Sequence, residues 1–392
     1  MLNNLIATVR EHRRRHNGYY RLTEGTSLSE VTYKVLAKLD GLSTEQASRA
    51  GNTKELSPHA LHLLPGLYEE PDGTTILPGR GNNPFATVAE TLWVFAGRND
   101  VGTLGKWLPR AKDYSDDGRV WTSGYGPRLR AWHGHIDQVE KVLYRLSKKP
   151  DTRQALITIW DPEVDGIKEG SKDYACNILV HFLIREGKLN MFVTVRSNDI
   201  IFGVAINVFE WCFLGNYLAY SLGIPFGQYY QTSNSLHLYD WKGETAKKVL
   251  RNEFLPLPRL ELAPCEDYPC AKFLDPDAMR RECDRIFTGA YEGTLDHFPK
   301  AYSQYLNPRL RDFYLALRAE TRLLGDIRDF LTGLRGIASV PLLLSLLDIA
   351  QRRRKEALWL KSGFEALWKD TKNEIRAGEY LRKLFAFNDI KG

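Results

Sequence analysis

The sequence predicts an α/β protein with a strand-rich middle and a helical end. Runs of β-branched and aromatic residues, broken by short polar stretches, have the composition of β-strands. Residues 205–222 are apolar on nearly every side, which predicts a helix buried through the middle of the domain. From about residue 274 the chain becomes rich in charged residues with helical spacing. We therefore expect one large α/β core followed by a mainly helical extension.

The N-terminal residues 1–48 have a helical pattern. Ser27 precedes an apolar run and Glu30 follows three positions later, which is the spacing of a helix capping box. Residues 49–84 are rich in Gly, Pro, Asn and Thr, so we expect loops and short strands there.

The middle of the chain supplies the predicted sheet. Helical periodicity at residues 87–95 and 136–146 comes before the first long strands. A polar break at residues 185–187 separates two strand candidates, which we expect to pair as a hairpin. The predicted strands are residues 155–160, 177–184, 188–195 and 228–239, and the predicted C-terminal helices are residues 307–324, 340–354 and 355–385. These patterns divide the chain into a helical N-terminal segment (1–48), a core (49–273) and a helical extension (274–392).

The charge balance argues against some classes of function. The formal net charge is +6 and the densest basic stretches, residues 13–15 and 352–355, are short, so we expect a local anion site and no nucleic-acid partner. The first residues lack the apolar core of a signal peptide, and residues 340–349 are too short to span a bilayer. We therefore expect an intracellular, cytoplasmic protein without a membrane contact.

The five cysteines include no Cys-x-x-Cys pair and are odd in number, which argues against a disulfide framework. Zinc binding by Cys265, Cys270 and Cys283 is a minor alternative, and we expect no metal site. Cys212 lies in an apolar run and is most simply a buried small hydrophobe. Cys176 has to be judged by its neighbours.

A candidate anion site follows one of the predicted strands. Arg196 and Ser197 offer a planar guanidinium fork and a hydroxyl, which together suit a phosphate group. The alternative is a surface turn with an ion pair. If the predicted hairpin forms, Cys176 and Arg196 lie on the same side of the sheet, where the positive charge favours the thiolate. The alternative is a structural cysteine at the start of a strand.

Two polar residues stand inside apolar helices. Asn207 is the one amide between residues 203 and 214, and it either reads the edge of a base or is a hydrogen-bonded core amide. Glu90 begins an apolar helix, where burial would raise its pKa and suit it to proton transfer. If Glu90 is exposed, it is a favourable charge near a helix N-terminus.

Taken in this order and spacing, these residues resemble thymidylate synthases and the related pyrimidine hydroxymethylases. The stretch from Cys176 through residues 196–207 to residues 237–239 keeps the family's spacing without an inserted residue, and the resemblance covers roughly residues 49–262. It implies the thymidylate-synthase fold, which is a large mixed β-sheet with a buried central helix. It also implies a one-carbon transferase that uses 5,10-methylenetetrahydrofolate and no metal.

The resemblance assigns roles to matching positions. Cys176 would add to C6 of the pyrimidine, so that C5 can attack the methylene group of the folate. Glu90 would organise water and proton transfers, and Tyr125 would help to remove the C5 proton. The implied ligand contacts are Arg49, Arg196 and Ser197 with the 5′-phosphate, Arg153 with the phosphate of the other subunit in a homodimer, His237 and Tyr239 with the sugar, and Asp199, Gly203 and Arg80 with the folate.

The family's substrate rule concerns the position of Asn207. An asparagine there goes with uracil, whereas the deoxycytidylate hydroxymethylases have an aspartate. The resemblance therefore implies dUMP before UMP as the substrate, with dCMP or CMP as the alternative.

Several departures from a standard synthase point to a hydroxymethylase. The position of the family's folate-facing tryptophan falls on residues 109–113, with Trp107 just before it and Tyr114 just after. If neither of them substitutes for it, the loss of that aromatic wall would let water, rather than hydride, reach the methylene at C5, giving 5-hydroxymethyl-dUMP and tetrahydrofolate. The family's short C-terminal tail is also replaced by a long helical stretch. Gln154 and Asn177 replace usual family residues, which bears on phosphate binding.

The segments at residues 114–118 and 124–130 resemble phage-type hydroxymethylases more than cellular synthases. The resemblance implies an enzyme that serves a phage with hydroxymethyluracil in its DNA, and therefore the host cytoplasm as the location. Two alternatives stay open. One is a divergent thymidylate synthase that makes dTMP and dihydrofolate. The other is an inactive core whose helical extension is a binding module.

Overall fold

The computed structural model describes most of the chain between residues 21 and 353. The described residues are 21–43, 45–64, 73–74, 77, 79–81, 83–166, 169–251, 275–299, 308–323, 325, 327–334, 337 and 340–353.

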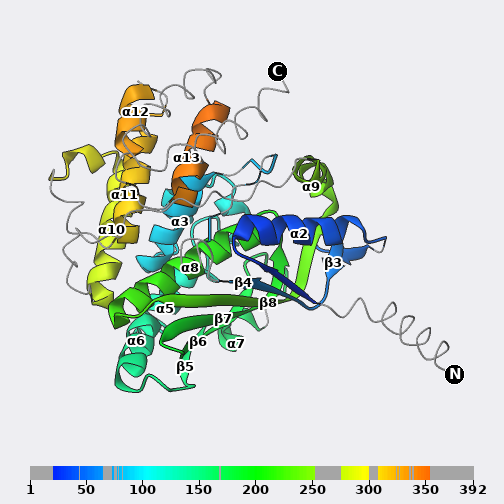
Figure 1. Ribbon diagram of the computed structural model, residues 1–392, viewed down its shortest axis with the longest axis horizontal. Helices are drawn as coiled ribbons and strands as arrows, with labels where there is room; N and C mark the ends of the chain where they lie inside the picture. The colour runs from blue at the N-terminus through cyan, green and yellow to red at the C-terminus, as the bar shows by residue number, and fades with distance from the viewer. Residues whose placement is uncertain are drawn as a thin grey trace.

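A mixed eight-stranded sheet forms the centre of the molecule (Figure 1). Its main path has the order β1-β4-β8-β7-β6-β5, and β3 pairs with β8 and with β2 beside this path. The β1–β4 and β7–β8 pairs are parallel and the others are antiparallel. The strands are β1 (Leu22–Gly25), β2 (Gln46–Ser48), β3 (Gly51–Leu56), β4 (His59–Leu63), β5 (Ala155–Thr158), β6 (Asn177–Arg185), β7 (Lys188–Asp199) and β8 (Phe226–Tyr239).

The predicted hairpin of β6 and β7 is confirmed. Arg185 and Lys188 face each other across the turn, and Glu186 and Gly187 both have positive φ, 53° and 70°. Two such residues in succession match the right-handed twist of a two-residue hairpin. The register that starts at this turn runs back to Leu179 opposite Thr194. An irregularity between Asn177 and Leu179 then shifts the pairing by one residue, so that Asn177 lies opposite Val195 at the far end.

Helix α8 (Gly203–Leu222) covers one face of β7 and β8 and confirms the predicted buried helix (Figure 1). Its residues are buried on nearly all sides, which explains why the sequence shows no polar face. The helix ends at Gly223, whose φ of 68° is the left-handed conformation that glycine adopts at helix C-termini.

The N-terminal segment is only partly helical. Helix α2 (Leu28–Asp40) begins at Ser27, whose side chain accepts a hydrogen bond from the Glu30 backbone as the capping pattern predicts. The expectation of helix over residues 1–48 is wrong at β1 and β2, because β1 pairs with β4 and buries alternate residues against the core. Residues 1–20 lie outside the described part of the chain.

The C-terminal helices pack on the core rather than standing apart from it. Helices α10, α11 and α13 contact α3, and Phe313 stacks on Phe209 and Phe213 of α8 with ring centroids 5.4 and 5.1 Å apart (Figure 1). One hydrophobic cluster includes residues of both parts. The domain boundary at residue 273 stays a prediction, since residues 252–274 and the predicted helix at 355–385 lie outside the described residues. The long helices are α3 (Pro84–Phe95), α6 (Gln138–Lys148), α10 (Pro276–Glu292), α11 (Pro308–Glu320), α12 (Ile327–Leu334) and α13 (Val340–Arg353), and the short ones are α4 (Val101–Leu104), α5 (Tyr125–Arg130), α7 (Pro162–Asp165) and α9 (Gly243–Leu250).

A row of apolar and aromatic side chains crosses five strands of the sheet. The register aligns Leu156, His181, Phe192, Tyr230 and His62 from β5 to β4. Consecutive rings along this row lie 5.3 to 6.3 Å apart. Leu156 is 47% exposed and Phe192 is 36% exposed, so this row is a partly uncovered apolar surface.

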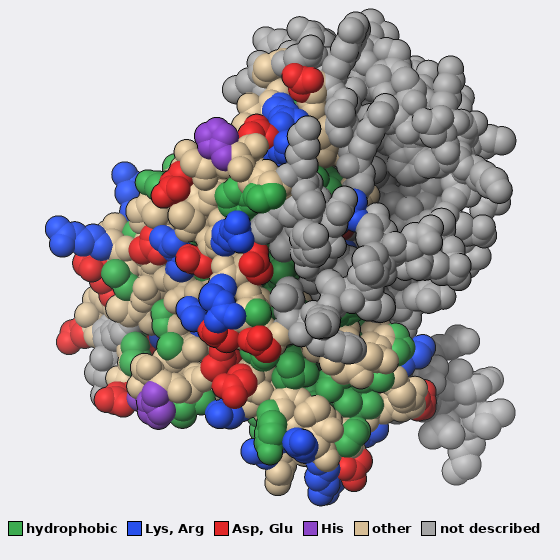
Figure 2. Space-filling model, turned by 90° about the vertical axis from the view of Figure 1, so that its left-hand side faces the viewer, with side chains coloured by type: hydrophobic (Ala, Val, Ile, Leu, Met, Phe, Trp, Pro, Cys, Tyr) green, Lys and Arg blue, Asp and Glu red, His purple; other side chains and the backbone are tan. Residues whose placement is uncertain are grey.

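The described surface carries both signs of charge. Figure 2 shows basic and acidic side chains interspersed over the described part of one face. Within the described ranges, no helix combines the length and apolar character needed to cross a membrane.

A buried ion pair connects α5 to α7. Arg128 forms a bidentate pair with Asp165, and both side chains are almost fully buried. The same guanidinium donates to the carbonyls of Ile159 and Thr122, at 2.7 and 2.9 Å. Because removing one partner of such a pair leaves a buried charge uncompensated, this contact should matter to stability.

We predict that Arg128→Met lowers the free energy of unfolding by about 3–5 kcal/mol. Urea denaturation at pH 7 measures this loss. Arg281→Met removes an exposed ion pair with Asp277 and serves as the control, which should stay close to the wild type. Equal unfolding free energies for the two variants would contradict this account.

Candidate active site

A cavity of about 890 Å³ lies among α3, α5, α8 and the start of β6. Its size is in the range of pockets that hold a nucleotide-sized ligand, roughly 300–1,000 Å³. Its lining includes most of the residues that the sequence singled out, namely Arg49, Glu90, Tyr125, Cys176, Arg196, Ser197, Asn207 and Tyr239.

Cys176 and Arg196 meet at the open end of the β6–β7 hairpin. The Arg196 backbone N–H donates to the Cys176 carbonyl at 2.9 Å. The Arg196 guanidinium donates through Nε to the Ala175 carbonyl at 2.8 Å, and its Nη2 lies 3.8 Å from the Cys176 Sγ. The hairpin therefore delivers the predicted pair of thiol and guanidinium to one cavity.

Burial raises the pKa of the Cys176 thiol, while Arg196 and Arg49 act in the opposite direction. We expected the positive neighbour to favour the thiolate, and its effect has that sign. Burial is nevertheless the larger cause, so the pKa of the thiol lies above its ordinary value. The predicted direction of the Arg196 effect agrees with the structure, and burial outweighs it.

A second cation, Arg49, reaches the cavity from the turn between β2 and β3. Its guanidinium donates to the carbonyls of Ser171 and Lys172, at 2.6 and 3.4 Å. The side chains of Arg49, Lys172, Arg196 and Ser197 all line the cavity. This end of the cavity can accept a dianionic phosphate.

Asp173 holds two loops of the site together, a role that the sequence reasoning missed. Its buried carboxylate accepts hydrogen bonds from the backbone and hydroxyl groups of Thr122 and Ser123. Asp173 lies three residues before Cys176, and Ser123 lies two residues before Tyr125. The nucleophile candidate and the tyrosine are thereby tied to each other.

Tyr125 and Asn177 form a pair inside the cavity wall. The Asn177 amide donates to the Tyr125 hydroxyl at 2.7 Å and accepts from the Trp211 indole at 3.2 Å. The Tyr125 and Trp211 rings stack with centroids 5.9 Å apart. Burial raises the pKa of Tyr125, so it stays a phenol, and its own proton is available to a ligand. Asn177, a departure from the usual family residue, thus holds the hydroxyl of Tyr125. Gln154, the other departure, accepts a hydrogen bond from Arg145 on the surface.

Asn207, Glu90 and Glu210 line the cavity from the two facing helices α8 and α3. Glu90 is buried, which decides between the two interpretations of its sequence position. Burial raises its pKa to about 8. Glu210 is the one acid within residues 203–222, yet the sequence analysis passed over it. Burial, followed by the nearby Glu90 carboxyl, raises the pKa of Glu210 well above its ordinary value.

Aromatic side chains enclose the rest of the cavity. Trp93, Trp121, Trp160 and Tyr114 line it, whereas Trp107 does not. The Trp107 indole donates to Glu320 at 2.7 Å and packs on Phe287, so it serves the contact with the C-terminal helices. Trp121 donates to the carbonyl of Ala111, in the stretch where the family tryptophan was sought. Of the two aromatic residues that the sequence offered in place of the family tryptophan, Tyr114 therefore lines the cavity and Trp107 does not.

Residues 78–275 match the family model described as Thymidylate synthase. A curated relative from Bacillus phage SP01, named deoxyuridylate hydroxymethyltransferase, is 37% identical over 298 residues, which are 72% of this chain and 76% of the relative. This match and the family model together establish the family of the chain.

The chain belongs to the thymidylate synthase family.

Two further relatives carry the same name. The protein of Delftia phage PhiW-14 is 33% identical over 245 residues, covering 60% of this chain and 66% of the relative. The protein of Pseudomonas phage M6 is 38% identical over 163 residues, covering 41% and 46%. This family member is thus a one-carbon transferase with phage relatives.

The remaining predicted residues of this thymidylate-synthase-family protein lie near the turn from β7 to α8. Asp199 is opposite His237 in the sheet, and its carboxylate accepts from the Ile201 backbone at 2.9 Å. Arg80 donates to the Ile201 carbonyl at 2.7 Å. At Gly203 an added Cβ would lie 2.5 Å from the Asn198 Oδ1, so a larger residue would not fit. Burial raises the pKa of Asp199 and lowers that of His237.

Arg153 lies apart from the cavity. It is exposed just before β5, and its carbonyl is 3.2 Å from the His181 ring nitrogen in the apolar row of the sheet. Within the described part of the chain, this contact joins it to His181 and not to another predicted site residue.

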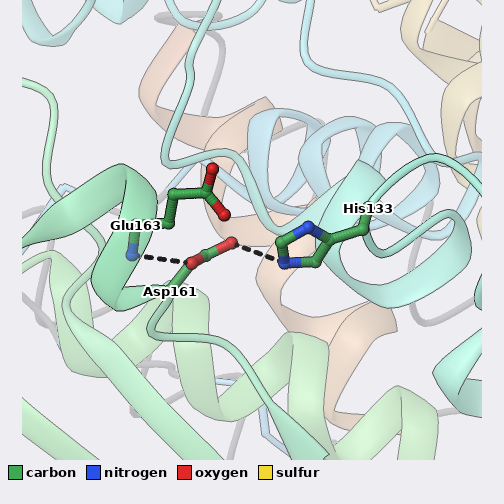
Figure 3. Close-up of side chains that lie close together, drawn as sticks. All are labelled: His133, Asp161 and Glu163. Carbon is green, nitrogen blue, oxygen red and sulfur yellow. Dashed lines mark hydrogen bonds and ion pairs between the residues drawn. The ribbon is translucent and has the colours of Figure 1, made fainter.

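One group outside the cavity has the ligand types of a metal site. Atoms of His133, Asp161 and Glu163 lie within 4.8 Å of one another (Figure 3). Both oxygens of Asp161 are already used, one by His133 at 3.2 Å and one by the Glu163 backbone at 3.0 Å. An ion pair and a helix N-cap explain this arrangement without a metal. Cys212 and Cys283 are buried, and the other two cysteines of the zinc alternative lie outside the described residues.

The raised pKa of Glu210 predicts a pH-dependent stability. Above about pH 4.5 the unfolded chain ionises both Glu210 and Glu90, whereas the buried pair in the folded protein retains a shared proton. Unfolding is therefore favoured as the pH rises, by up to about 1.4 kcal/mol per pH unit for each retained proton. We predict that Glu210→Gln, which has no proton to lose, becomes more stable than the wild type at pH 7 and matches it near pH 4.5.

Denaturant unfolding at several pH values measures this difference. Glu244→Gln, on the surface of α9, is the matched control and should show no such gain. If the free energies of unfolding of Glu210→Gln and the wild type change with pH in parallel, the pKa of the Glu210 carboxyl is not raised in the folded protein.

Proposed function

We propose that this protein hydroxymethylates dUMP at C5, converting 5,10-methylenetetrahydrofolate, dUMP and water into 5-hydroxymethyl-dUMP and tetrahydrofolate. The observation that carries the proposal is the pairing of Cys176 with Arg196 in a cavity that also holds Asn207. The names of the phage relatives support the choice of substrate and product.

In this proposal the nucleotide lies with its phosphate among Arg49, Arg196 and Ser197. These residues offer two guanidinium groups and a hydroxyl at one end of the cavity. His237 and Tyr239 bind the sugar hydroxyl, and their rings lie 4.9 Å apart at the end of β8.

The cavity also fits a folate. Its volume of about 890 Å³ exceeds what a nucleotide alone fills, and Trp93, Trp121 and Tyr114 supply flat aromatic surfaces for a pterin ring. When bound, methylenetetrahydrofolate supplies the one-carbon unit. Asp199, Gly203 and Arg80 are the proposed contacts on the side of the β7–α8 turn.

Cys176 is the proposed nucleophile toward C6 of the uracil ring. Its thiol must lose a proton first, and Arg196 stabilises the resulting thiolate. Bond formation between Sγ and C6 makes C5 the nucleophilic carbon. Glu90, whose pKa of about 8 lies near the working pH, can give and take protons at the base in these steps.

Tyr125 acts in this scheme as a phenol. Since burial keeps it protonated, it cannot itself be the base that removes the C5 proton. With its oxygen held by Asn177, the hydroxyl can donate to a water molecule or to the ligand. It therefore orients the acceptor of that proton.

Asn207 is the proposed reader of the uracil edge. No hydrogen bond to its carboxamide is found within the described chain, and the residue lines the cavity, so both its donor and its acceptor are available. Uracil presents an N3–H donor beside the O4 acceptor, which one carboxamide can match.

Thymidylate synthesis is the second candidate, because the aromatic lining of the cavity favours a drier site and hydride transfer. A putative thymidylate synthase of Methanothermobacter marburgensis is 35% identical over 138 residues, or 35% of this chain. We favour hydroxymethylation, because the relatives with more extensive matches carry that name.

We further propose a homodimer in which the apolar row of the sheet forms the contact. The exposure of Leu156 and Phe192 supports this, and Arg153 lies beside the row. A partner on this face would bring Arg153 toward a second active site.

The test supplies dUMP and methylenetetrahydrofolate and identifies the products by mass spectrometry. We expect 5-hydroxymethyl-dUMP and tetrahydrofolate, and no product from Cys176→Ser. With dUMP and dCMP supplied together, only dUMP should be consumed.

Formation of dTMP and dihydrofolate would make the protein a thymidylate synthase instead. Consumption of dCMP alone would contradict the role of Asn207. Full product formation by Cys176→Ser would contradict the covalent mechanism.

A further inference from the structure

Glu210 belongs to the cavity but has no role in the steps above. It lies one helical turn after Asn207 on α8, so the two side chains share the face toward the cavity. Glu90 faces it from α3, which packs against α8 (Figure 1). Two carboxyl groups from different helices thus border the same space as the proposed nucleophile.

Both carboxyl groups are buried and incompletely hydrogen-bonded. Glu210 is 1% exposed and Glu90 is 9% exposed. One oxygen of each, Glu210 Oε1 and Glu90 Oε2, has no hydrogen-bond partner among the described residues. A buried carboxyl oxygen without a partner is costly, so a native protein retains such a pair only where something else binds to it.

No cation of the described chain neutralises Glu210. The one charged group that acts on its titration is the Glu90 carboxyl. Arg196, a cation of the cavity lining, is engaged with Ala175 and Cys176. Two close carboxyl groups in this setting share one proton, so that one is an acid while the other is a base.

A carboxylate next to a carboxylic acid, in the part of the cavity lined by Asn207, is a good binding site for one water molecule. The water can donate to the ionised group and accept from the protonated one, which satisfies both free oxygens. Asn207, which would hold the uracil edge, is on the same helix face, so this water would lie near the C5 substituent.

We propose that Glu210 is a catalytic residue which, with Glu90, binds the water molecule that adds to the methylene group at C5 and accepts that water's proton. This inference rests on the proposed function. It identifies the group that directs the reaction to the hydroxymethyl product even though the cavity is lined by aromatic residues.

In this step the nucleotide carries an exocyclic methylene at C5 and is still attached to Cys176. The water oxygen bonds to that exocyclic carbon, and the ionised carboxyl group takes one proton from the water. The electrons of the exocyclic double bond move to the C4 oxygen as an enolate. The enolate then re-forms the C4 carbonyl and the C5–C6 double bond, the C6–S bond breaks, and the Cys176 thiolate leaves. No oxidant or reductant is required.

The test follows two products from dUMP labelled with tritium at C5. Tritium release reports attack by Cys176 and bond formation at C5, and 5-hydroxymethyl-dUMP reports addition of water. In Glu210→Gln we expect the ratio of hydroxymethyl product to released tritium to fall at least 10-fold, since one general base contributes on the order of 10²-fold or more. Added 2-mercaptoethanol should then trap the methylene as a thioether, and KM for dUMP should stay within about twofold.

A second variant guards against misfolding. Glu210→Ala should lose the same ratio, and sodium formate should restore part of it while sodium chloride should not. Glu244→Gln, an exposed carboxylate on α9, is the matched control and should keep the wild-type ratio. Wild-type product identity separately tests the proposed function, because dTMP from the wild type refutes hydroxymethylation whatever the variants do.

Two results would overturn the role of Glu210 while leaving hydroxymethylation intact. One is an unchanged ratio in both variants. The other is a parallel loss of tritium release and product, which would mean that Glu210 acts before the water step or only supports the structure.

Discussion

The hydrogen bond from the Arg196 backbone to the Cys176 carbonyl is the contact on which the rest of the site depends. It lies beyond the β6–β7 pairing that starts at the turn of Glu186 and Gly187 and shifts by one residue between Asn177 and Leu179. A slip of one residue would send one of the two side chains to the opposite face of the sheet. The distance of 3.8 Å between Sγ and the guanidinium thus follows from strand pairing.

The two ends of the cavity around this contact differ in the charge of the side chains that line them. At the Cys176 end, guanidinium groups favour anions, which suits a phosphate and a thiolate. At the α3–α8 end the described residues supply two carboxyl groups and no cation that acts on Glu210, so protons are retained there. A nucleotide spanning the cavity would have its phosphate at the cationic end and its reacting carbon near the proton-holding end. The arrangement separates binding from proton transfer within one pocket.

The sequence predicted the parts of the fold whose residues repeat with a clear period. The hairpin, α8 and the cap at Ser27 were predictable because local composition and turn chemistry determine them. The strand β1 was not, because four residues carry little pattern and its pairing with β4 is a tertiary contact. The packing of Phe313 on α8 was not predictable either, because the periodicity of a helix does not identify the element against which it packs.

In the site, most of the residues that the sequence singled out line the cavity, while their roles stay proposals. The sequence reasoning missed Asp173 and Glu210 for different reasons. Asp173 acts by accepting backbone hydrogen bonds from a distant loop, which leaves no spacing signal. Glu210 did carry a signal, being the one acid in an apolar helix, and a search for lone charges in buried runs would have found it. The sequence left open whether Trp107 faces the cavity, because its partner, Glu320, lies far along the chain.

The central claim is that Cys176 attacks the pyrimidine ring. Incubation with 5-fluoro-dUMP and methylenetetrahydrofolate tests it directly. The proton at C5 can be removed by a base, but a fluorine in its place cannot, so the reaction stops there and the covalent adduct accumulates. Peptide mass spectrometry should find both the nucleotide and the folate on the peptide that contains Cys176, with Cys212 and Cys283 unmodified. An adduct on another cysteine, or none at saturating ligand, would contradict the account.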